Sequence, residues 1–459
     1  MFCNMERLKT FFKKVRQHFS TPIRLVMFGF LAIILGGTVL LLMPFATRYP
    51  GSLSFVNALF TATSATCVTG LSVENLVTDF TVYGQIVVML LSQIGGIGFM
   101  TVTSTVYIFI RHKISLKKRL SMREDLSQQG LSGLKRLTLD VVKLTFIAEG
   151  IGAILLTIAF SRYYDFGTAV WMGIFHSVMA FCNSGFDIVS PEGTSFEAFA
   201  SDPFILIVLA LLIIVGGIGF MVVSDLVRVR RWRKLKLHTK VVLPLTAALI
   251  VIGTAGFLVA EYNNPLTLGN MNFGDKLLNA FFQSVTARTA GFASLNQNNL
   301  TGFSQTLTIV LMFIGACPGS TGGGIKTTTV FVLLANVVAT LRKKSEVIID
   351  MHSVGRETLA KAATVIVLAL TVAVVSIMGL ELACASRFST GQIIFEQVSA
   401  YATVGLSRGI TPHLDTVSKL ILTINMYIGR IGSFGFFMAF VATDKIQPKV
   451  KYPEAGITL

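Results

Sequence analysis

Charged side chains are scarce in this sequence of 459 residues. Asp, Glu, Lys and Arg together make up 14% of it, hydrophobic residues make up 53%, and the mean hydropathy is +0.71. Globular proteins carry about 25% charged residues, and a water-soluble fold could not cover this much apolar surface. Many apolar runs are continuous and reach ~20 residues, enough to cross ~30 Å of hydrocarbon as a helix. The sequence therefore predicts an all-α polytopic membrane protein.

Residues that build disulfide, metal or catalytic sites are also few. The five cysteines are scattered, odd in number and without metal-ligand spacing, which argues against a disulfide framework or a zinc site. The six histidines are scattered too. Glu149, Glu261 and Glu381 lie on different predicted spans, so they form no cluster for intramembrane catalysis. We expect neither an enzyme nor a covalent cofactor.

Acidic residues are outnumbered, with 23 Asp and Glu against 39 Lys and Arg and a net charge of +16. If the N-terminus is cytosolic and the spans alternate, nearly all the basic residues lie on the cytosolic side, the bias that orients membrane proteins. The basic residues expected on the outer side of the membrane are Arg48, Arg162, Lys276, Arg288, Arg387, Arg408 and Lys419. We therefore expect a multi-pass protein of the cell membrane with both termini cytoplasmic. Its basic runs would contact lipid headgroups of the bilayer, and no nucleic acid is expected as a partner.

A glycine-centred stretch occurs four times. The copies end at Gly70, Gly185, Gly291 and Gly405, which are separated by 115, 106 and 114 residues. Each glycine has a Phe ten positions before it and a Leu or Phe directly after it, and an apolar span flanks each copy on both sides. Regular spacing of this kind indicates an internal repeat. The sequence predicts four repeated span–pore-loop–span units around one central pore.

The predicted organisation alternates pore units with cytosolic segments. In order these are a basic N-terminus (1–22), the first unit (23–110), a linker (111–139), the second unit (140–228), a basic linker (229–239), the third unit (240–341), a linker (342–358), the fourth unit (359–444) and a tail (445–459). The loop-in segments are expected near 53–75, 170–189, 276–295 and 391–408, and the returning spans over 81–110, 203–225, 306–340 and 418–443. Hydropathy alone does not separate a re-entrant helix from an amphipathic helix at the membrane surface.

The four stretches suit a ring of backbone carbonyls. Carbonyl oxygens can replace the water around a dehydrated cation, and non-helical backbone at membrane depth is tolerated where it lines a water-filled path. Glycine permits the φ/ψ values that turn carbonyls inward. A tight turn between helices would also favour glycine, but four copies favour a selectivity filter. The candidate ion-binding residues are Thr66, Cys67, Val68, Thr69, Gly70, Phe181, Cys182, Asn183, Ser184, Gly185, Ala287, Arg288, Thr289, Ala290, Gly291, Tyr401, Ala402, Thr403, Val404 and Gly405.

The third return is interrupted between Gly315 and Gly324. Five glycines and Pro318 within ten residues cannot hold a helix, since each Gly costs ~1 kcal/mol and Pro ~3 kcal/mol relative to Ala. The freed backbone groups need protein or water partners, so we expect a loop inside the bundle, below the filter, where it could obstruct the path. A flexible kink for helix packing is the alternative. A phosphate-binding loop is disfavoured, because Lys326 does not directly follow the second glycine and no strand precedes the loop.

Arg430 is a charged residue at membrane depth. It lies near the middle of the last predicted span, where a charge costs ~3 kcal/mol. Carbonyls of the third-unit loop are its expected partners, and a purely structural tie between spans is the alternative. The candidate gate therefore consists of Gly315, Ala316, Cys317, Pro318, Gly319, Ser320, Thr321, Gly322, Gly323, Gly324, Lys326 and Arg430.

These motifs resemble the Trk/Ktr/HKT potassium transporters, and most closely the membrane subunit of the Ktr type. The resemblance covers residues 25–445 and is carried by the four glycine stretches, Gly-Gly-Ile-Gly at 95–98 and 216–219, and the segments 314–328 and 426–432. It implies a potassium-channel-like pore fused into one chain, with the four repeat glycines in the filter and an intramembrane gating loop. Some plant relatives with Ser at the first position prefer sodium, so Gly70 implies potassium selectivity.

The second and third stretches depart from the Thr-Val-Gly pattern, which leaves the number of ion sites open. Arg288 is expected at the flank of the filter, because a cation facing the path would repel the ion.

The resemblance further implies a homodimer and a cytosolic nucleotide-binding regulatory ring subunit. We expect potassium uptake, with potassium as the permeating ion and sodium as a candidate activator. The sequence shows no soluble nucleotide-binding domain, so nucleotide control would come from the partner. The alternative is an alternating-access sodium/potassium or proton/potassium secondary transporter, whose broken helices also bind ions near the midplane. Four like repeats fit a single central pore better than two inverted halves.

Overall fold

The computed structural model describes residues 22–98, 134–229, 231–344, 346–384 and 387–440. The predictions for residues 1–21, for 99–133, which include the end of the first return and most of the first linker, and for the tail from 441 onward lie outside the described residues.

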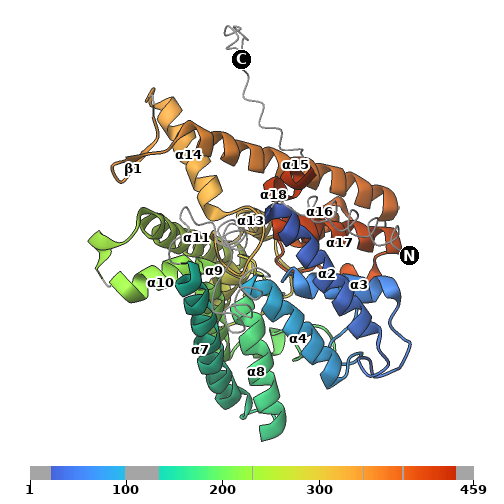
Figure 1. Ribbon diagram of the computed structural model, residues 1–459. Helices are drawn as coiled ribbons and strands as arrows, with labels where there is room; N and C mark the ends of the chain where they lie inside the picture. Colours follow the sequence, from blue (N-terminus) through green and yellow to red (C-terminus); the bar gives the residue numbers. More distant parts are fainter. Residues whose placement is uncertain (1–21, 99–133, 230, 345, 385–386, 441–459) are drawn as a thin grey trace, which may run out of the picture.

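Four units follow one another along the chain, each with an outer helix, a short inner helix and a return helix (Figure 1). The outer helices are α2 (Pro22–Leu42), α7 (Leu134–Phe160), α11 (Leu237–Glu261) and α15 (Arg356–Cys384). The inner helices are α3 (Phe55–Thr66), α8 (Phe166–Cys182), α12 (Phe273–Thr286) and α16 (Thr390–Tyr401). The return helices are α4 (Val82–Ile97), α9 (Pro203–Ile218), α13 (Gly302–Phe313) and α17 (Thr416–Ile431). The prediction of four span–loop–span units is confirmed.

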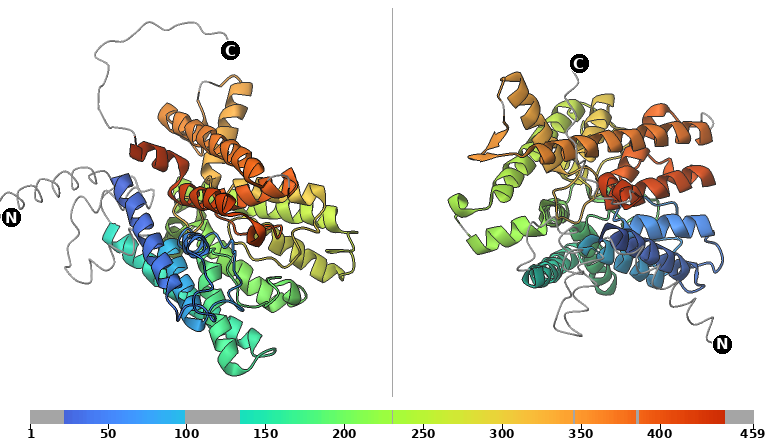
Figure 2. Two further views of the ribbon diagram at one scale, coloured as in Figure 1. Left: turned by 90° about the vertical axis from the view of Figure 1, so that its right-hand side faces the viewer. Right: turned by 45° about the horizontal axis from the view of Figure 1, so that its top comes forward.

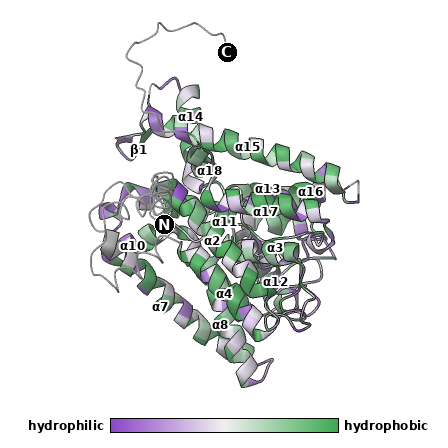
Figure 3. Cartoon of the chain, turned by 45° about the vertical axis from the view of Figure 1, so that its right-hand side comes forward, coloured by the Kyte–Doolittle hydropathy of each residue, from purple (hydrophilic) through white to green (hydrophobic). Residues whose placement is uncertain are grey.

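The outer helices present apolar side chains outward. Within the described residues, four helices are long and apolar enough to cross a membrane, and six spans result if each bent helix pair is counted as one. In α15 only 17% of the most apolar window is buried, and Val375 and Leu382 are among its exposed side chains. Figure 3 shows the hydrophobic residues that dominate this helix. Apolar surface of this extent is stable only against lipid or another protein, as expected for a multi-pass membrane protein.

Polar N-caps start all the inner and return helices. The capping residues are Ser54, Asp165, Asn272 and Ser389 for the inner helices and Thr81, Asp202, Thr301 and Asp415 for the return helices. Each side chain accepts a backbone N–H of the first turn, which would otherwise lack a partner, and a cap of this kind is worth about 1 kcal/mol. These caps define where the elements begin.

The second and fourth returns bend sharply. Helix α9 meets α10 (Phe220–Val229) at 96°, and α17 meets α18 (Ser433–Phe440) at 95°. Gly219 and Gly432 occupy the bends with φ of +105° and +86°, values that favour glycine. The sequence signalled a break only in the third return. Arg430 lies in the last turn of α17, two residues before the bend at Gly432, and therefore close to the middle of the span that α17 and α18 form together.

The third return is broken, as predicted. Helix α13 ends at Phe313 and α14 (Thr327–Leu341) begins after a non-helical segment, 314–326, which we call the inner loop. Beyond α14 the linker forms an unpredicted hairpin of β1 (Ile348–Ile349) and β2 (His352–Ser353). Asp350 and Met351 both have positive φ at its turn. Figure 2 shows α14 and this hairpin projecting from one end of the helical bundle.

Candidate functional site

The four repeat glycines meet in a closed ring at the centre of the molecule. A β-carbon placed on Gly70 would lie 2.3 Å from the carbonyl oxygen of Ser184, and one placed on Gly185 would lie 2.7 Å from that of Ala290. One on Gly291 would lie 2.4 Å from the oxygen of Val404, and one on Gly405 would lie 2.1 Å from that of Thr69. Each glycine therefore touches the residue preceding the glycine of the next unit. The units follow one another around the ring in chain order and close it.

The backbone before each glycine alternates its handedness. The residues two positions before the glycines, Val68, Asn183, Thr289 and Thr403, have φ of 59°, 59°, 72° and 52°, and the glycines themselves have φ of 92°, 70°, 86° and 94°. A left-handed conformation costs a non-glycine residue ~1–2 kcal/mol. Because all four segments share this unfavourable conformation, the surrounding structure must impose it, as is typical of functional sites. Positions are numbered below from the ring glycine, so these residues stand at −2.

Backbone N–H groups of the ring segments are tied back to the inner helices. The amide at −1 donates to the carbonyl at −6 in three units, at 2.8 Å each: Thr69 to Ser64, Ser184 to Met179 and Val404 to Ser399. In the third unit Ala290 donates instead to Thr286, at 3.0 Å. Among the described residues, no hydrogen bond is made to the carbonyl oxygens at −1. The N–H groups are thus used by the scaffold, while the carbonyls at −1 line the ring.

The carbonyl at −4 behaves differently. Thr66, Phe181 and Tyr401 each place this oxygen against a glycine of their own return helix, where a β-carbon would lie 2.0, 2.0 and 1.7 Å away. The glycines are Gly95, Gly216 and Gly429. These three members of the predicted site therefore contact the return helices. The same close approach explains why the Gly-Gly-Ile-Gly motifs begin with glycine.

The residues directly after the ring glycines anchor the segments on the other side. Leu71, Phe186, Phe292 and Leu406 are all at most 2% exposed. Each ring segment is thus held between the end of its inner helix, at −3 to −5, and a buried side chain at +1.

The inner loop lies against one side of the ring. A β-carbon on Gly322 would lie 2.2 Å from the hydroxyl of Thr289, and one on Gly323 would lie 2.3 Å from that of Thr403. The Gly323 amide also donates to the Thr403 hydroxyl at 3.1 Å. Two side chains at −2 therefore contact the loop, which agrees with the predicted position below the ring.

Two cationic side chains hold the inner loop through its carbonyls. Lys326 Nζ donates to the carbonyl oxygens of Gly322 and Gly323, at 2.7 and 3.3 Å. The Arg430 guanidinium donates to the carbonyl oxygen of Thr321 in the loop and to that of Gly95 at the end of α4. The bond from Arg430 to the loop was expected from the sequence. The second bond, which links the loop to the first unit, was not.

The loop is also tied to the second unit through the backbone. Cys317 and Thr321 donate their amides to the carbonyls of Gly217 and Gly216, at 3.2 and 3.3 Å, and Phe220 donates to Gly319 at 2.9 Å. Contacts to the second and fourth units, and through Arg430 to the first, thus hold a segment that contains too many glycines to be rigid by itself.

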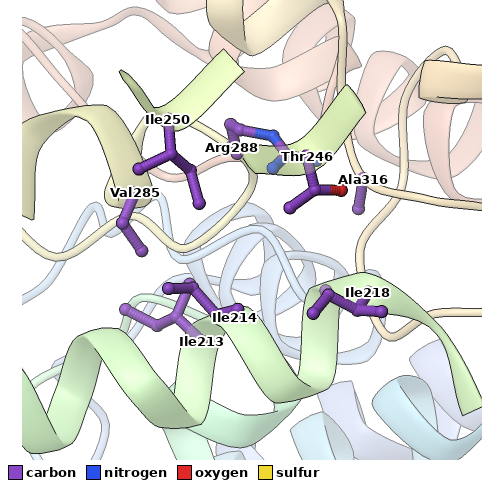
Figure 4. Close-up of a pocket in the computed structure, with 9 residues that line it drawn as sticks. Ile213, Ile214, Ile218, Thr246, Ile250, Val285, Arg288 and Ala316 are labelled. Carbon is purple, nitrogen blue, oxygen red and sulfur yellow. The ribbon is translucent and has the colours of Figure 1, made fainter. Parts of the chain in front are cut away.

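Arg288 lies beside the ring, as the sequence analysis expected. It is 8% exposed, and it lines a cavity between α9 and α11 together with Thr246, Ile218 and Ala316 (Figure 4). The cavity volume is about 10 Å³, roughly the room that one water molecule needs. The Nη2 atom of Arg288 lies 3.8 Å from the Sγ atom of Cys317 in the inner loop.

One ionisable residue near the ring was missed by the sequence analysis. Asp187 stands at +2, on the side of the ring away from the inner loop and outside the spanning helices, where the other units have Ser72, Ala293 and Ser407. It is half-buried, and burial raises the pKa of its carboxyl to about 6, against the opposing effect of hydrogen bonds from Ser195 and nearby amides. No group of three or more His, Cys, Asp or Glu that could hold a metal ion exists within the described residues.

Comparison with known proteins gives a consistent result. Residues 13–449 match the TrkH family, described as cation transport protein. The chain is 39% identical to the Ktr system potassium uptake protein B of Bacillus subtilis, over 95% of this chain and 96% of that protein. It is 38% identical to the potassium/sodium uptake protein NtpJ of Enterococcus hirae, over 97% and 99%. The crystal structure of the potassium transporter TrkH from Vibrio parahaemolyticus has the same fold, with a TM-score of 0.70 at 18% identity, over 90% of this chain and 85% of that chain.

Asp187 generates a pH prediction. Because its pKa is about 6, the carboxyl is negative at neutral pH and becomes neutral as the pH on its side of the ring falls through 6. A unit charge ~4 Å from a cation in water is worth ~1 kcal/mol, so we expect cation uptake to fall by up to about fivefold over this range. Asp187→Asn should show the low rate at all pH values.

Uptake into liposomes, with the pH varied on one side at a time, measures this effect. The matched control is Glu192→Gln, an exposed carboxyl of the same loop, which should keep the parent profile. An Asp187→Asn protein that still loses uptake near pH 6 would contradict the assignment.

Proposed function

The chain belongs to the TrkH family of cation transport proteins, and on that premise we propose that it takes up potassium through the ring of four glycines. The observation that supports this most is the closure of the ring with its −1 carbonyls free of hydrogen bonds among the described residues. Carbonyl oxygens in such a ring can replace the hydration shell of a potassium ion. The family consists of transport proteins, so no enzymatic step is required.

The inner helices would add to this attraction. Each of α3, α8, α12 and α16 ends three to five residues before its ring glycine, so its C-terminus is directed toward the ring. The C-terminal end of a helix carries about half a negative charge, which stabilises cations nearby. A permeating ion would thus be favoured by carbonyl oxygens and by four helix ends, without a fixed carboxylate in the path.

The closed ring also favours a single central pore over alternating access. Transporters of the alternating kind commonly bind ions between two inverted halves. Here all four units contribute the same atoms to one ring in cyclic order. We keep the secondary transporter as the alternative function.

We further propose that the inner loop is the gate and that Arg430 and Lys326 hold it in place. The loop lies directly against residues at −2 of two ring segments, where it would obstruct a path through the ring. Hydrogen bonds to a charged group are worth ~1.5–3 kcal/mol each, so a few of them can hold the loop closed and still be broken by a partner. Sodium activation and gating by a nucleotide-binding subunit belong to the same proposal and rest on the family resemblance.

The membrane orientation and assembly are proposals as well. We propose that both termini are cytoplasmic and that two copies of the chain form a homodimer bound to a cytosolic regulatory ring. Exposed basic side chains of the linker between the second and third units, Arg231, Arg233 and Lys234, offer an acidic partner a contact surface.

The first prediction concerns selectivity. Gly70→Ser and Gly405→Ser each put a side chain where φ is above 90° and where a β-carbon would meet a backbone oxygen at 2.1–2.3 Å. The ring must shift to accept it, so we expect the K+/Na+ uptake ratio to fall about tenfold or more, since a change of ~1.4 kcal/mol in relative binding suffices. Gly36→Ser, in open space on α2, should keep the parent ratio. Unchanged ratios in both ring variants would refute the filter.

The second prediction concerns the gate. Deleting residues 319–323 should raise potassium flux into liposomes without any partner, because the obstruction is removed. Arg430→Ala should raise it about tenfold, the equivalent of one lost charged hydrogen bond, while Arg356→Ala, an exposed arginine of α15, should change nothing. Size-exclusion profiles check that the variants assemble. If neither the deletion nor Arg430→Ala exceeds the parent, the loop is not the gate.

The third prediction concerns assembly. Mass measurement of the purified protein should give a dimer, and adding the nucleotide-binding subunit should give a larger complex. Changing Arg231, Arg233 and Lys234 together to Glu should weaken that complex and leave the dimer intact, whereas Arg162→Glu should affect neither. A stable monomer that ignores the subunit would disprove the proposed assembly.

A further inference from the structure

Two inner helices carry an ionisable side chain at the same position, nine residues before the ring glycine. In the second unit this residue is His176, and in the fourth unit it is Glu396. They are 0% and 1% exposed. Neither belongs to the ring segment or to the inner loop, so the function proposed above gives them no role.

His176 joins its inner helix to the segment that leaves the ring. Its Nε2 atom accepts the backbone N–H of Ile188, at +3, over 3.2 Å. Its Nδ1 atom lies 2.8 Å from the carbonyl oxygen of Met172, one turn earlier in α8. A carbonyl accepts and an N–H donates, so the two partners require a neutral ring protonated on Nδ1.

The His176 ring is enclosed by aromatic side chains. Its centroid lies 5.1 Å from that of Phe196, 5.5 Å from that of Phe160 and 5.6 Å from that of Phe175. The ring of Phe292, the +1 anchor of the third unit, lies 6.4 Å away. The imidazole is therefore fixed in orientation and also contacts the anchor of the neighbouring ring segment.

Glu396 makes the equivalent contact in the fourth unit. It accepts the backbone N–H of Arg408, again at +3, over 3.0 Å. The hydroxyl of Ser407 donates to the same carboxyl oxygen, and that of Thr411 donates to the other at 3.0 Å. A histidine in the second unit and a glutamate in the fourth, both at −9, thus each accept the backbone N–H of the residue at +3.

The other two units lack this bond. Position −9 is Thr61 in the first unit, where the hydroxyl has no partner among the described residues, and Phe282 in the third. Since the units follow one another around the ring in chain order, the second and fourth units face each other across it. The two acceptors therefore hold opposite sides of the ring.

We propose that His176 and Glu396 are positioning residues that set the ring to the size of potassium. The inference rests on the proposed role of the glycine ring as the filter. A site must hold its geometry within about 0.5 Å to act on its ligand, and the +3 amide lies only three residues beyond the ring glycine. When that amide is released, the outer end of the segment can move inward, and the carbonyls can then approach the smaller sodium ion.

The test removes or preserves the acceptor at each position. His176→Phe keeps an aromatic ring but removes the acceptor, and Glu396→Leu does the same for the carboxyl. Each should lower the K+/Na+ uptake ratio in liposomes about fivefold or more. His176→Gln and Glu396→Gln keep an oxygen acceptor and should stay within about twofold of the parent. Thr61→Val, at the matched buried position without a bond to the loop, should leave the ratio unchanged.

Gly70→Ser in the same assay separates this inference from the proposed filter. If Gly70→Ser and Gly405→Ser both leave the ratio unchanged, the filter proposal fails. If Gly70→Ser lowers the ratio while both acceptor-free variants keep it, only the positioning role is overturned. The positioning role would also be overturned if the two Gln variants lost as much selectivity as His176→Phe and Glu396→Leu. The loss of selectivity would then not be due to the missing hydrogen bond. If His176→Phe does not assemble, the Glu396 pair carries the test alone.

Discussion

Four backbone segments can meet around one axis only if none of them carries a β-carbon at the meeting point. Gly70, Gly185, Gly291 and Gly405 satisfy this constraint, because any added β-carbon would lie within 2.1–2.7 Å of a neighbouring carbonyl oxygen. Positive φ at every one of them adds a second reason for glycine. The capped inner helices, the buried +1 anchors and the −1 amides bound to the helices all serve to hold these four residues at that distance.

The same constraint extends outward to the return helices. Gly95, Gly216 and Gly429 let three return helices approach the carbonyl ends of the inner helices. In the first two units the next residue is again glycine, but in the fourth it is Arg430. That single difference in the repeat puts a guanidinium where it reaches both the inner loop and the end of α4. Arg430 thereby holds the inner loop, which only the third unit supplies among the described residues, against one side of a fourfold repeated scaffold.

The cationic side chains around the inner loop contact backbone carbonyls and a thiol, with no carboxylate among the contacts that the structure describes. Lys326 and Arg430 donate to backbone oxygens, and Arg288 donates to Cys317. Backbone dipoles compensate a buried charge only partly, and an incompletely paired charge at low dielectric is costly. Such contacts suit the gate role that we propose for the inner loop, because the loop is held by several weak bonds and not by one strong ion pair.

The sequence by itself determined the membrane class, the four repeats, the positions of the ring glycines, the break at 315–324 and the family, which the comparisons confirmed. These features depend on composition, spacing and local backbone preference, all of which can be seen along one stretch of chain. Only the tertiary structure decided the order of the units around the ring, the different directions of the −1 and −4 carbonyls and the second partner of Arg430. It also revealed the bends at Gly219 and Gly432 and the matched acceptors His176 and Glu396. Each of these depends on which atoms meet after folding, often more than 100 residues apart in sequence, and a lone His or Glu in an apolar helix gives no local signal of the amide that it will accept.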